Sequence, residues 1–358
     1  MIDADAFLRK LINPVDRLIS ILIWIYISVL IIWFFGRATI GDKSILILLI
    51  NFLGVWLFFP LVFFLLWAIL HKQKKNFILL IPPLVLFLIF YGPYFIPHST
   101  TGVDNSKSIT VLTFNVRNNN PEVDSISKML ISSHADLLAL QEVTEIHERY
   151  LLQTLTTQYP YHDYIGKGNL AVYSKYPILE QKSNSSVEWP VQSVIVQINT
   201  KELQFINAHF ARVGLLEFET TFDGTQVREL EHIREDQIAL IDRIIDENKL
   251  PTIVACDCNM TSLNTAYAQI TSTLEDAFRN RGWGLGNTIL FPRAFDIQSF
   301  INFPFQRIDY LFYSPDINVL KVGLNYFHSG SDHLPLWAQF DLQQDENVLT
   351  HHQKSFAR

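Results

Sequence analysis

The sequence contains little cysteine and little charge. Only 2 of its 358 residues are cysteine, and charged residues make up 18% of the chain. With only two cysteines in the chain, support for a structural zinc cluster is weak. The two cysteines also give no information about the redox compartment. A zinc-cluster function is therefore disfavoured.

Both cysteines lie in the stretch IVACDCNM, residues 253–260. The apolar, β-branched residues that lead into it predict a buried strand that ends in a loop. Side chains alternate faces along a strand, so Cys256 and Cys258 share one face and Asp257 and Asn259 share the other. We expect the cysteines to be buried, inert packing residues. A disulfide between them is not expected, because residues two apart on a strand lie near the upper Cα–Cα limit with parallel Cβ directions.

Charge is completely absent from three apolar stretches, at residues 18–35, 45–70 and 77–96. Each is near or above the ~18 apolar residues of a membrane-spanning helix. A signal peptide is disfavoured for the first stretch, which ends in bulky aromatic residues. Three buried helices of a soluble protein are the other alternative, which the lack of charge and the surrounding Trp and Tyr residues disfavour. We predict a membrane anchor at residues 1–98 with three transmembrane helices and the lipid bilayer as its partner.

Basic residues around the apolar stretches predict the orientation of the anchor. Three precede the first stretch, two lie between the first and second, and three lie between the second and third: Arg9, Lys10 and Arg17; Arg37 and Lys43; Lys72, Lys74 and Lys75. The more basic ends of spanning helices face the cytoplasm. We therefore predict a cytoplasmic N-terminus and an extracytoplasmic chain after Pro97, with the reverse topology as the alternative.

The remaining chain is predicted to form one domain at 107–342, after a linker at 99–106 and before a polar tail at 343–358. Residues 1–99 carry eight Lys or Arg and four Asp or Glu, which leaves 20 basic and 31 acidic residues beyond them and a net charge of −11 there. Tight non-specific binding to nucleic acid depends on neutralising phosphates with basic residues. Nucleic acid is therefore the less favoured partner.

Short strand-like runs recur in this domain, with few helical patterns between them. The runs are SITVLTFNV, LLALQEV, LAVYSKYPI, SVIVQIN, LQFINAHF, TIVACDCN, IDYLFYS and LPLWAQFDL, and helical patterns occupy 125–135 and 227–249. Because strands and helices do not alternate strictly, the pattern predicts an α/β sandwich of two sheets with helices outside.

Polar residues stand at the ends of these runs. They are Asn115, Gln141, Glu142, His209, Asp257, Asn259, Asp309, Asp332 and His333. Any one of them alone is better explained as a turn, a helix cap or a packing residue. Their recurrence at the same kind of position predicts that they meet in one site.

With these motifs the sequence resembles the endonuclease/exonuclease/phosphatase superfamily, the DNase I-like metal-dependent phosphoesterases. The resemblance covers roughly 107–342 and rests on LTFNV, LALQEV, NLAVYSKYPI, INAHF, PTIVACDCNM, RIDYLFYS and GSDHLP in that order. It implies a four-layered α/β sandwich. Two departures are Cys256 and Cys258 where the family usually has Gly and Phe, and Ala208 where Thr is frequent. The first pair faces away from the site by strand parity, so we expect the chemistry to be kept.

The resemblance also implies roles for the strand-end residues. Glu142, Asn115 and Asp332 would hold Mg²⁺ or Mn²⁺, which prefer hard oxygen ligands. Asp257 and Asn259 would position or deprotonate the attacking water. His333, oriented by Asp309, would act as base or contact phosphate, and His209 would donate to a phosphoryl or leaving-group oxygen. Which of Asp257 and His333 is the base stays open, and Asn169 and Arg117 are weaker candidates for substrate binding.

The apolar stretches extend the resemblance to a membrane-anchored bacterial subgroup that includes a teicoplanin-resistance protein. This implies an enzyme of the bacterial inner or cell membrane with an extracytoplasmic or periplasmic catalytic domain. Its substrate would be a phosphate or pyrophosphate linked to a lipid. The alternatives are a membrane-tethered nuclease that acts on extracytoplasmic DNA and a non-catalytic binding protein built on the same fold.

Overall fold

The computed structural model describes residues 4–97, 108–183, 189–212, 224–291 and 302–342. The predicted linker at 99–106 and the predicted tail at 343–358 lie outside these residues. The chain divides into two compact units, Met1–Pro93 and Tyr94–Arg358. The sequence placed the boundary near residue 98, so the structure assigns the residues that close the third apolar stretch to the second unit.

The first unit contains the three apolar stretches as helices. The regions Pro14–Thr39, Ile45–Leu70 and Lys74–Phe95 are long and apolar enough to cross a membrane. The helices are α1 (Ala4–Thr39), α2 (Ile45–Leu53), α3 (Phe59–Leu70), α4 (Lys74–Leu79) and α5 (Ile81–Tyr91), with short 3₁₀ turns at Gly41–Lys43, Gly54–Phe58 and Gly92–Phe95. The second stretch is interrupted at Gly54, whose φ of 58° ends α2. Prolines at the start of α3 and α5 fit there because the first turn of a helix needs no N–H donor.

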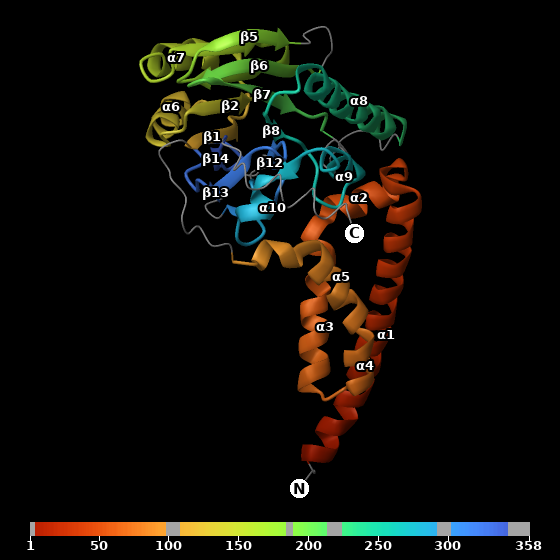
Figure 1. Ribbon diagram of the computed structural model, residues 1–358. Coiled ribbons are helices and arrows are strands. Elements are labelled where there is room, and N and C mark those ends of the chain that lie inside the picture. Colours follow the sequence, from red (N-terminus) through yellow and green to blue (C-terminus); the bar gives the residue numbers. More distant parts are fainter. Residues whose placement is uncertain (1–3, 98–107, 184–188, 213–223, 292–301, 343–358) are drawn as a thin grey trace. The chain divides into compact units, whose positions relative to one another are not determined.

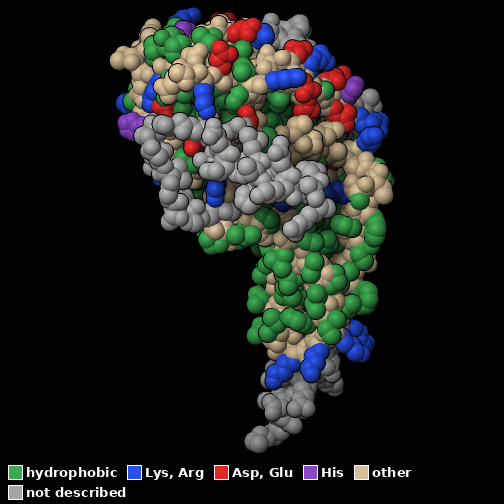
Figure 2. Space-filling view, in the orientation of Figure 1, with side chains coloured by type: hydrophobic (Ala, Val, Ile, Leu, Met, Phe, Trp, Pro, Cys, Tyr) green, Lys and Arg blue, Asp and Glu red, His purple; other side chains and the backbone are tan. Residues whose placement is uncertain are grey.

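Polar side chains tie the helices of the first unit together. Trp33 donates to buried Asn51 at 2.8 Å, and Asn51 donates to buried Asp42 at 2.6 Å. Figure 2 shows hydrophobic side chains over these helices and Lys or Arg side chains near the turn between α3 and α4. An apolar surface with basic residues at one end is typical of helices that lie in a membrane.

The second unit is built on two six-stranded sheets (Figure 1). The first has the order β13–β14–β1–β2–β4–β3: Asn318–Leu324, Leu336–Asp341, Ser108–Asn115, Leu137–Gln141, Leu170–Ser174 and Tyr161–Ile165. The second has the order β5–β6–β7–β8–β12–β9: Ile178–Ser183, Val191–Ile198, Lys201–His209, Thr252–Asp257, Asp309–Tyr313 and Glu275–Asp276. A small hairpin pairs β10 (Ile289–Phe291) with β11 (Phe303–Gln306). These strands include every run that the sequence predicted.

Helices cover the outer face of each sheet. On the first sheet, α6 (Val123–Ser132) and α7 (Glu145–Leu155) pack into a core cluster with β1, β2 and β4. On the second, α8 (Gly224–Asn248) and α9 (Thr265–Ile270) pack with β7, β8 and β12, and α10 (Ala277–Arg281) follows β9. The two sheets face each other, since Asn207 of β7 donates to backbone oxygens of β2 and β4. The predicted four-layered α/β sandwich and the three apolar helices before it are confirmed.

Strand register brings the polar strand ends to one place. The parallel pair β1–β2 aligns Asn115 with Gln141, and the parallel pair β7–β8 aligns His209 with Asp257. The antiparallel pair β8–β12 then sets Asp309 opposite Asp257. Parallel strands end at the same edge of a sheet, so the side chains that follow them lie close together.

The structure corrects the expectation for the cysteines. Both are buried, as predicted, but they form a disulfide. The prediction assumed a continuous strand, whereas β8 ends at Asp257, the residue between the two cysteines. The Cα–Cα distance there is 5.1 Å, inside the usual disulfide range.

Candidate active site

A pocket of about 360 Å³ opens where the strands end. Its lining contains seven of the ten residues to which the resemblance assigned a role: Glu142, Asn169, His209, Asp257, Asn259, Asp332 and His333. It also contains Asn118, Lys167, Gly168, Trp189, Pro190, Arg212 and Ile289. Asn115 and Asp309 lie directly behind the lining, because both bond to side chains that form it.

Asp257 lies at the centre of the site, at the end of β8. Its Oδ2 accepts a hydrogen bond from Asn115 Nδ2 at 2.9 Å and lies 3.5 Å from His209 Nε2 and 3.7 Å from His333 Nε2. Burial alone raises the pKa of this carboxyl, but the two imidazoles and the hydrogen bonds outweigh burial and lower the pKa below its ordinary value. Asp257 is therefore ionised at neutral pH.

Glu142 is the second carboxylate of the site. It follows β2 in a left-handed conformation, with φ of 59°, which turns its side chain toward Asn115. Its Oε1 accepts from Asn115 Nδ2 at 3.0 Å and lies 4.0 Å from His209 Nε2, while its Oε2 accepts from the Asn118 N–H at 2.9 Å. Burial raises the pKa of Glu142, but His209 and these hydrogen bonds lower it by more. This carboxylate is also ionised at neutral pH.

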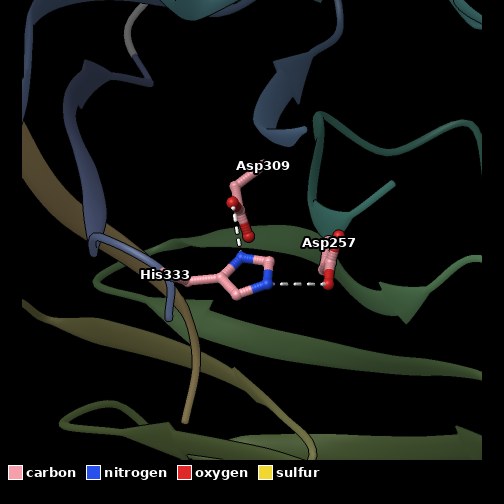
Figure 3. A group of neighbouring side chains, drawn as sticks. All are labelled: Asp257, Asp309 and His333. Carbon is pink, nitrogen blue, oxygen red and sulfur yellow. Dashed lines mark hydrogen bonds and ion pairs between the residues drawn. The ribbon is translucent and has the colours of Figure 1, made fainter. Parts of the chain in front are cut away.

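His333 is held between two aspartates (Figure 3). Its Nδ1 bonds to Asp309 Oδ2 at 2.9 Å, and its Nε2 faces Asp257. Burial alone lowers the pKa of His333, but the facing carboxylates of Asp309 and Asp257 raise it to about 10. Burial also raises the pKa of Asp309. The imidazole therefore carries a proton on each nitrogen at neutral pH and presents one of them to the pocket.

Backbone contacts fix the loop that carries His333. Ser331 Oγ accepts from the His333 N–H at 3.0 Å and donates to the Asn115 carbonyl at 2.7 Å. Thr288 Oγ1 accepts from the N–H groups of Ile308 and Asp309, both at 3.2 Å, and its carbonyl accepts from Leu334. The two members of the His333–Asp309 pair are thus positioned by the same threonine.

His209 lies at the end of β7, opposite the His333–Asp309 pair. Trp189 packs edge-on against its ring with centroids 5.4 Å apart. Gln237 of α8 donates to the His209 carbonyl, and Arg234 of the same helix donates to the carbonyl of Asn259. These two helix residues hold the strand ends from behind, although they do not line the pocket.

The remaining sequence candidates lie at the margin. Asn169 lines the pocket with φ of 52°, and its carbonyl accepts from Val143. Arg117 lies outside the lining, with its Nε 3.9 Å from Asp332 Oδ1. Asn259 donates to the Phe210 carbonyl through its amide nitrogen.

Sequence reasoning did not place Lys167, Trp189 or Ser331 in or behind the site. Lys167 and Trp189 lie in connections between strands, where no hydrophobic periodicity in the sequence indicates which residues face a site. Ser331 is part of GSDHLP, so its motif position was the available signal.

The donor set suits a hard divalent cation. Asn115 Nδ2 occupies the space between the Glu142 and Asp257 carboxylates, within 3.0 Å of each. Carboxylate oxygens that converge in this way are the ligands that Mg²⁺ and Mn²⁺ prefer. The ligand atoms of Asp257, Asp309 and His333 also lie within 4.8 Å of one another. Because the two ring nitrogens of His333 face different carboxylates, we interpret this second group as a hydrogen-bonded chain.

Comparisons with known proteins agree with this architecture. Residues 112–333 match the model of the Endonuclease/Exonuclease/phosphatase family. A protein of that description from Bacteroides vulgatus has a similar structure, with 21% identity, a TM-score of 0.54, and coverage of 66% of this chain and 99% of that one. A mannosyl-6-phosphatase from Bacteroides thetaiotaomicron gives 19% identity, a TM-score of 0.51 and coverage of 65% and 99%. Humanized D. rerio TDP2 gives 15% identity, a TM-score of 0.51, and coverage of 66% of this chain and 99% of that one. At these identities the likeness shows the fold. No curated protein matches the chain in sequence.

Proposed function

Because the chain belongs to the endonuclease/exonuclease/phosphatase family, we propose that it is a divalent-metal-dependent hydrolase that attacks a phosphate ester or pyrophosphate with water. Members of the family act on phosphate esters, and a mannosyl-6-phosphatase is among the structural neighbours. The observation that carries the proposal is the convergence of Asn115, His209 and His333 on one oxygen of buried Asp257. An ionised carboxylate can orient a water, and the imidazoles on either side of it can hold a negatively charged phosphoryl group.

Glu142 and Asp257, with Asn115 and Asp332 beside them, would hold Mg²⁺ or Mn²⁺. When bound, the cation would neutralise charge on the non-bridging phosphoryl oxygens. Asn115 would have to turn its amide, since its Oδ1 now accepts from the Arg117 N–H at 2.9 Å and its nitrogen faces the carboxylates. The two amide orientations are close in shape, so this rotation needs no backbone movement.

The pKa values favour different roles for Asp257 and His333. Asp257 is ionised and can accept the proton of the attacking water, with Asn259 beside it to orient that water. His333 is protonated and stabilises charge on the phosphoryl group through Nε2–H, held in place by Asp309. His209 lies where it can donate to a leaving-group oxygen. Of the two candidates for the base, the electrostatics support Asp257.

The substrate that we propose is a phosphate or pyrophosphate carried by a membrane lipid. Tethering beside the membrane raises the effective concentration of a substrate in the same bilayer. The net charge of −11 beyond residue 99 disfavours a long polyanion. A nuclease is the second candidate, with Arg212 in the lining and Arg117 near it as its basic contacts.

We further propose that the first unit anchors the protein in a bacterial inner or cell membrane. Three helices that are long and apolar enough to span a bilayer support the anchor. An odd number of crossings from a cytoplasmic N-terminus puts the catalytic domain in the extracytoplasmic or periplasmic space. The disulfide between Cys256 and Cys258 supports that side, because disulfides persist in oxidising compartments.

The test is Mg²⁺-dependent phosphate release by the detergent-solubilised full-length protein, with a lipid pyrophosphate, a phospholipid and plasmid DNA in parallel. Glu142→Ala and His333→Ala should each lower activity at least about a hundredfold, since each removes a charge that faces the reacting group. Glu145→Gln is the matched control, because Glu145 is an exposed glutamate on α7.

Phosphate from a lipid substrate that disappears in both variants supports the proposal. Nicked plasmid without lipid turnover would establish the nuclease instead. A wild-type protein that turns over none of the three, or variants as active as the wild type, would contradict the proposed site and favour the non-catalytic binding protein.

A further inference from the structure

Tyr94 stands where the third apolar stretch enters the second unit. It is the first residue of that unit and belongs to the 3₁₀ turn Gly92–Phe95 that closes the stretch Lys74–Phe95. Its side chain is 2% exposed. A tyrosine beside a membrane segment usually lies with its hydroxyl in water at the interface. This one is enclosed in the catalytic unit instead.

The hydroxyl of Tyr94 bonds to a buried arginine. Arg307 Nη2 donates to Tyr94 Oη at 2.7 Å, and the two nitrogens of its fork donate to Asp276 at 2.9 and 2.7 Å. The guanidinium also lies 5.0 Å from the Tyr94 ring and 4.5 Å from the Tyr310 ring. A buried charge needs all its partners, so the position of Arg307 depends on Tyr94 as well as on Asp276.

Arg307 leads directly into the strand that carries Asp309. The Arg307 carbonyl accepts from Tyr310 Oη at 3.1 Å, and the next carbonyl, that of Ile308, accepts from the Cys258 N–H at 2.9 Å. Asp309 then begins β12 and holds His333. Arg307 precedes Asp309 by two residues. A displacement of Arg307 would therefore move the Asp309 carboxylate, which orients the His333 imidazole.

A second route runs from the backbone of Tyr94. Its carbonyl accepts from the Gly284 N–H at 2.7 Å, which fixes the start of the loop 284–288. Gly284 and Gly286 have φ of 84° and 64°, so the shape of this loop requires glycine at both positions. The loop ends at Thr288, which is fully buried and whose oxygens accept from Ile308, Asp309 and Leu334. Leu334 is the neighbour of His333.

We propose that Tyr94 is a positioning residue for the His333–Asp309 pair, acting through Arg307 on one side and through the loop from Gly284 to Thr288 on the other. Tyr94 holds Arg307, two residues before Asp309, and it holds Gly284 at the start of the loop whose last residue, Thr288, bonds to the backbone of Asp309 and Leu334. The chain that leaves the third apolar helix is thereby part of the scaffold of the site. The inference rests on the proposed hydrolysis for its kinetic readout, and it has a structural readout that does not.

The kinetic experiment uses the full-length protein in detergent with Mg²⁺ and the substrate that the wild type turns over best. Tyr94→Ala should lower kcat about tenfold or more and leave KM within about twofold, because misplacement of a catalytic pair costs rate more than binding. Tyr94→Phe keeps the ring beside Arg307 and the carbonyl that accepts from Gly284, but it loses the hydroxyl. Its kcat should therefore lie between those of the wild type and Tyr94→Ala. Phe95→Ala is the matched control. Phe95 is the neighbour of Tyr94 in the same 3₁₀ turn, but its ring contacts the exposed ring of Trp283.

The structural experiment is hydrogen–deuterium exchange of the same variants at a temperature where all remain folded. Tyr94→Ala should raise exchange in the peptides that cover 303–313 and 328–336, and Phe95→Ala should not. Exchange that rises near Arg307 but not in 328–336 would overturn the proposal. So would a wild-type kcat in Tyr94→Ala, or a loss that falls on KM alone. If the wild type releases no phosphate, the proposed function fails and the exchange result still decides this inference.

Discussion

The His333–Asp309 pair is the most constrained feature of the site at the scale of single residues. Asp309 is 1% exposed, and among the described residues its Oδ1 has no hydrogen-bond partner. Asp309 Oδ2 therefore bonds to His333, while Oδ1 is buried beside it. Such an arrangement is costly unless the imidazole is charged. It accounts for the raised pKa of His333 and assigns Asp309 the role of orienting the ring.

Replacement of Asp309 by Asn should separate this role from packing. The amide has the same shape but no charge, and it can hold the ring in the wrong tautomer. We expect phosphate release to fall by about 10²- to 10⁴-fold, with little change in thermal stability because the volume is kept. The measurement is initial rate as a function of Mg²⁺ concentration.

Asp236→Asn is the matched control, because Asp236 is an exposed aspartate on α8. If high Mg²⁺ restores the rate of Asp309→Asn, Asp309 is a ligand of the cation and not a partner of His333. An unchanged rate would remove Asp309 from the mechanism altogether.

Most of the candidate site residues could be found from the sequence because each stands at or next to one end of a strand, and such ends meet at one edge of a sheet. Residues that act through the backbone of a distant segment could not. Thr288 touches Asp309 and Leu334 only after the chain has folded, and nothing around it in the sequence marks that contact. Cys256 and Cys258 show the same limit, since their pairing depends on where β8 ends and not on residue type.

At the scale of elements, the two sheets are joined by a buried polar network. Asn207 of β7 donates to the carbonyls of Leu140 and Ala171 and to Gln192 Oε1, and it accepts from Gln141 Nε2 at 2.8 Å. Asn207 lies two residues before His209, and Gln141 lies directly before Glu142. The network therefore fixes β2 and β7 relative to each other, and with them the candidate residues Glu142 and His209 at their ends.

Asn207→Leu should destabilise the protein by about 3 kcal/mol, because several buried polar groups would lose their partner at once. Thermal or denaturant unfolding of the full chain measures the loss. Gln269→Leu on the exposed face of α9 is the control and should change stability by no more than about 0.5 kcal/mol. A loss as small as that of the control would show that water can replace Asn207 between the sheets.

Helix α7 joins the first sheet through a buried carboxyl. Glu148 of α7 accepts a hydrogen bond from Tyr173 Oη of β4, and Glu148 is 8% exposed. Burial raises the pKa of Glu148, an effect that the hydrogen bond from Tyr173 only partly offsets. Folding thus favours the protonated carboxyl, so its contribution to stability is fully present below the unfolded pKa and is lost as the pH rises through the folded pKa.

Glu148→Gln should accordingly raise Tm at pH 7.5 and change it little near pH 4.5, because the amide still accepts from Tyr173 and carries no charge to desolvate. Tm measured across that range gives the result. The control is Glu145→Gln in the first turn of the same helix, which should lower Tm slightly at pH 7.5 by removing a favourable charge at a helix N-terminus. A lower Tm for Glu148→Gln at pH 7.5 would mean that the charged hydrogen bond outweighs burial.

The sequence predicted the layers and missed several elements for physical reasons. The long helix at 227–249 and the eight strand runs have clear periods, and each is present. Helix α7, the short strand β9 and the hairpin of β10 and β11 are too short or too polar for periodicity to mark them. They form because neighbouring elements cover them, as Asp276 shows by capping α10 and pairing with Arg307.

At the scale of the whole molecule, two independent features bear on its orientation in a membrane. The proposed topology puts the basic residues at the N-terminus and between the second and third helices in the cytoplasm, as the positive-inside rule predicts. The disulfide between Cys256 and Cys258 agrees with the proposal that the second unit lies where thiols are oxidised. With three crossings the two statements agree, whereas the reverse topology would place a disulfide-bonded domain in a reducing compartment.

This agreement predicts the labelling of introduced cysteines by a membrane-impermeant maleimide in intact cells. Glu202→Cys lies at an exposed position near the start of β7 in the second unit and should be labelled. Gln73→Cys lies between the second and third apolar helices and should be labelled only after the membrane is opened. The native chain, whose two cysteines are paired, should stay unlabelled in both conditions until it is reduced. Labelling of Gln73→Cys but not Glu202→Cys in intact cells would reverse the topology, and with it the membrane face on which the proposed lipid substrate is sought.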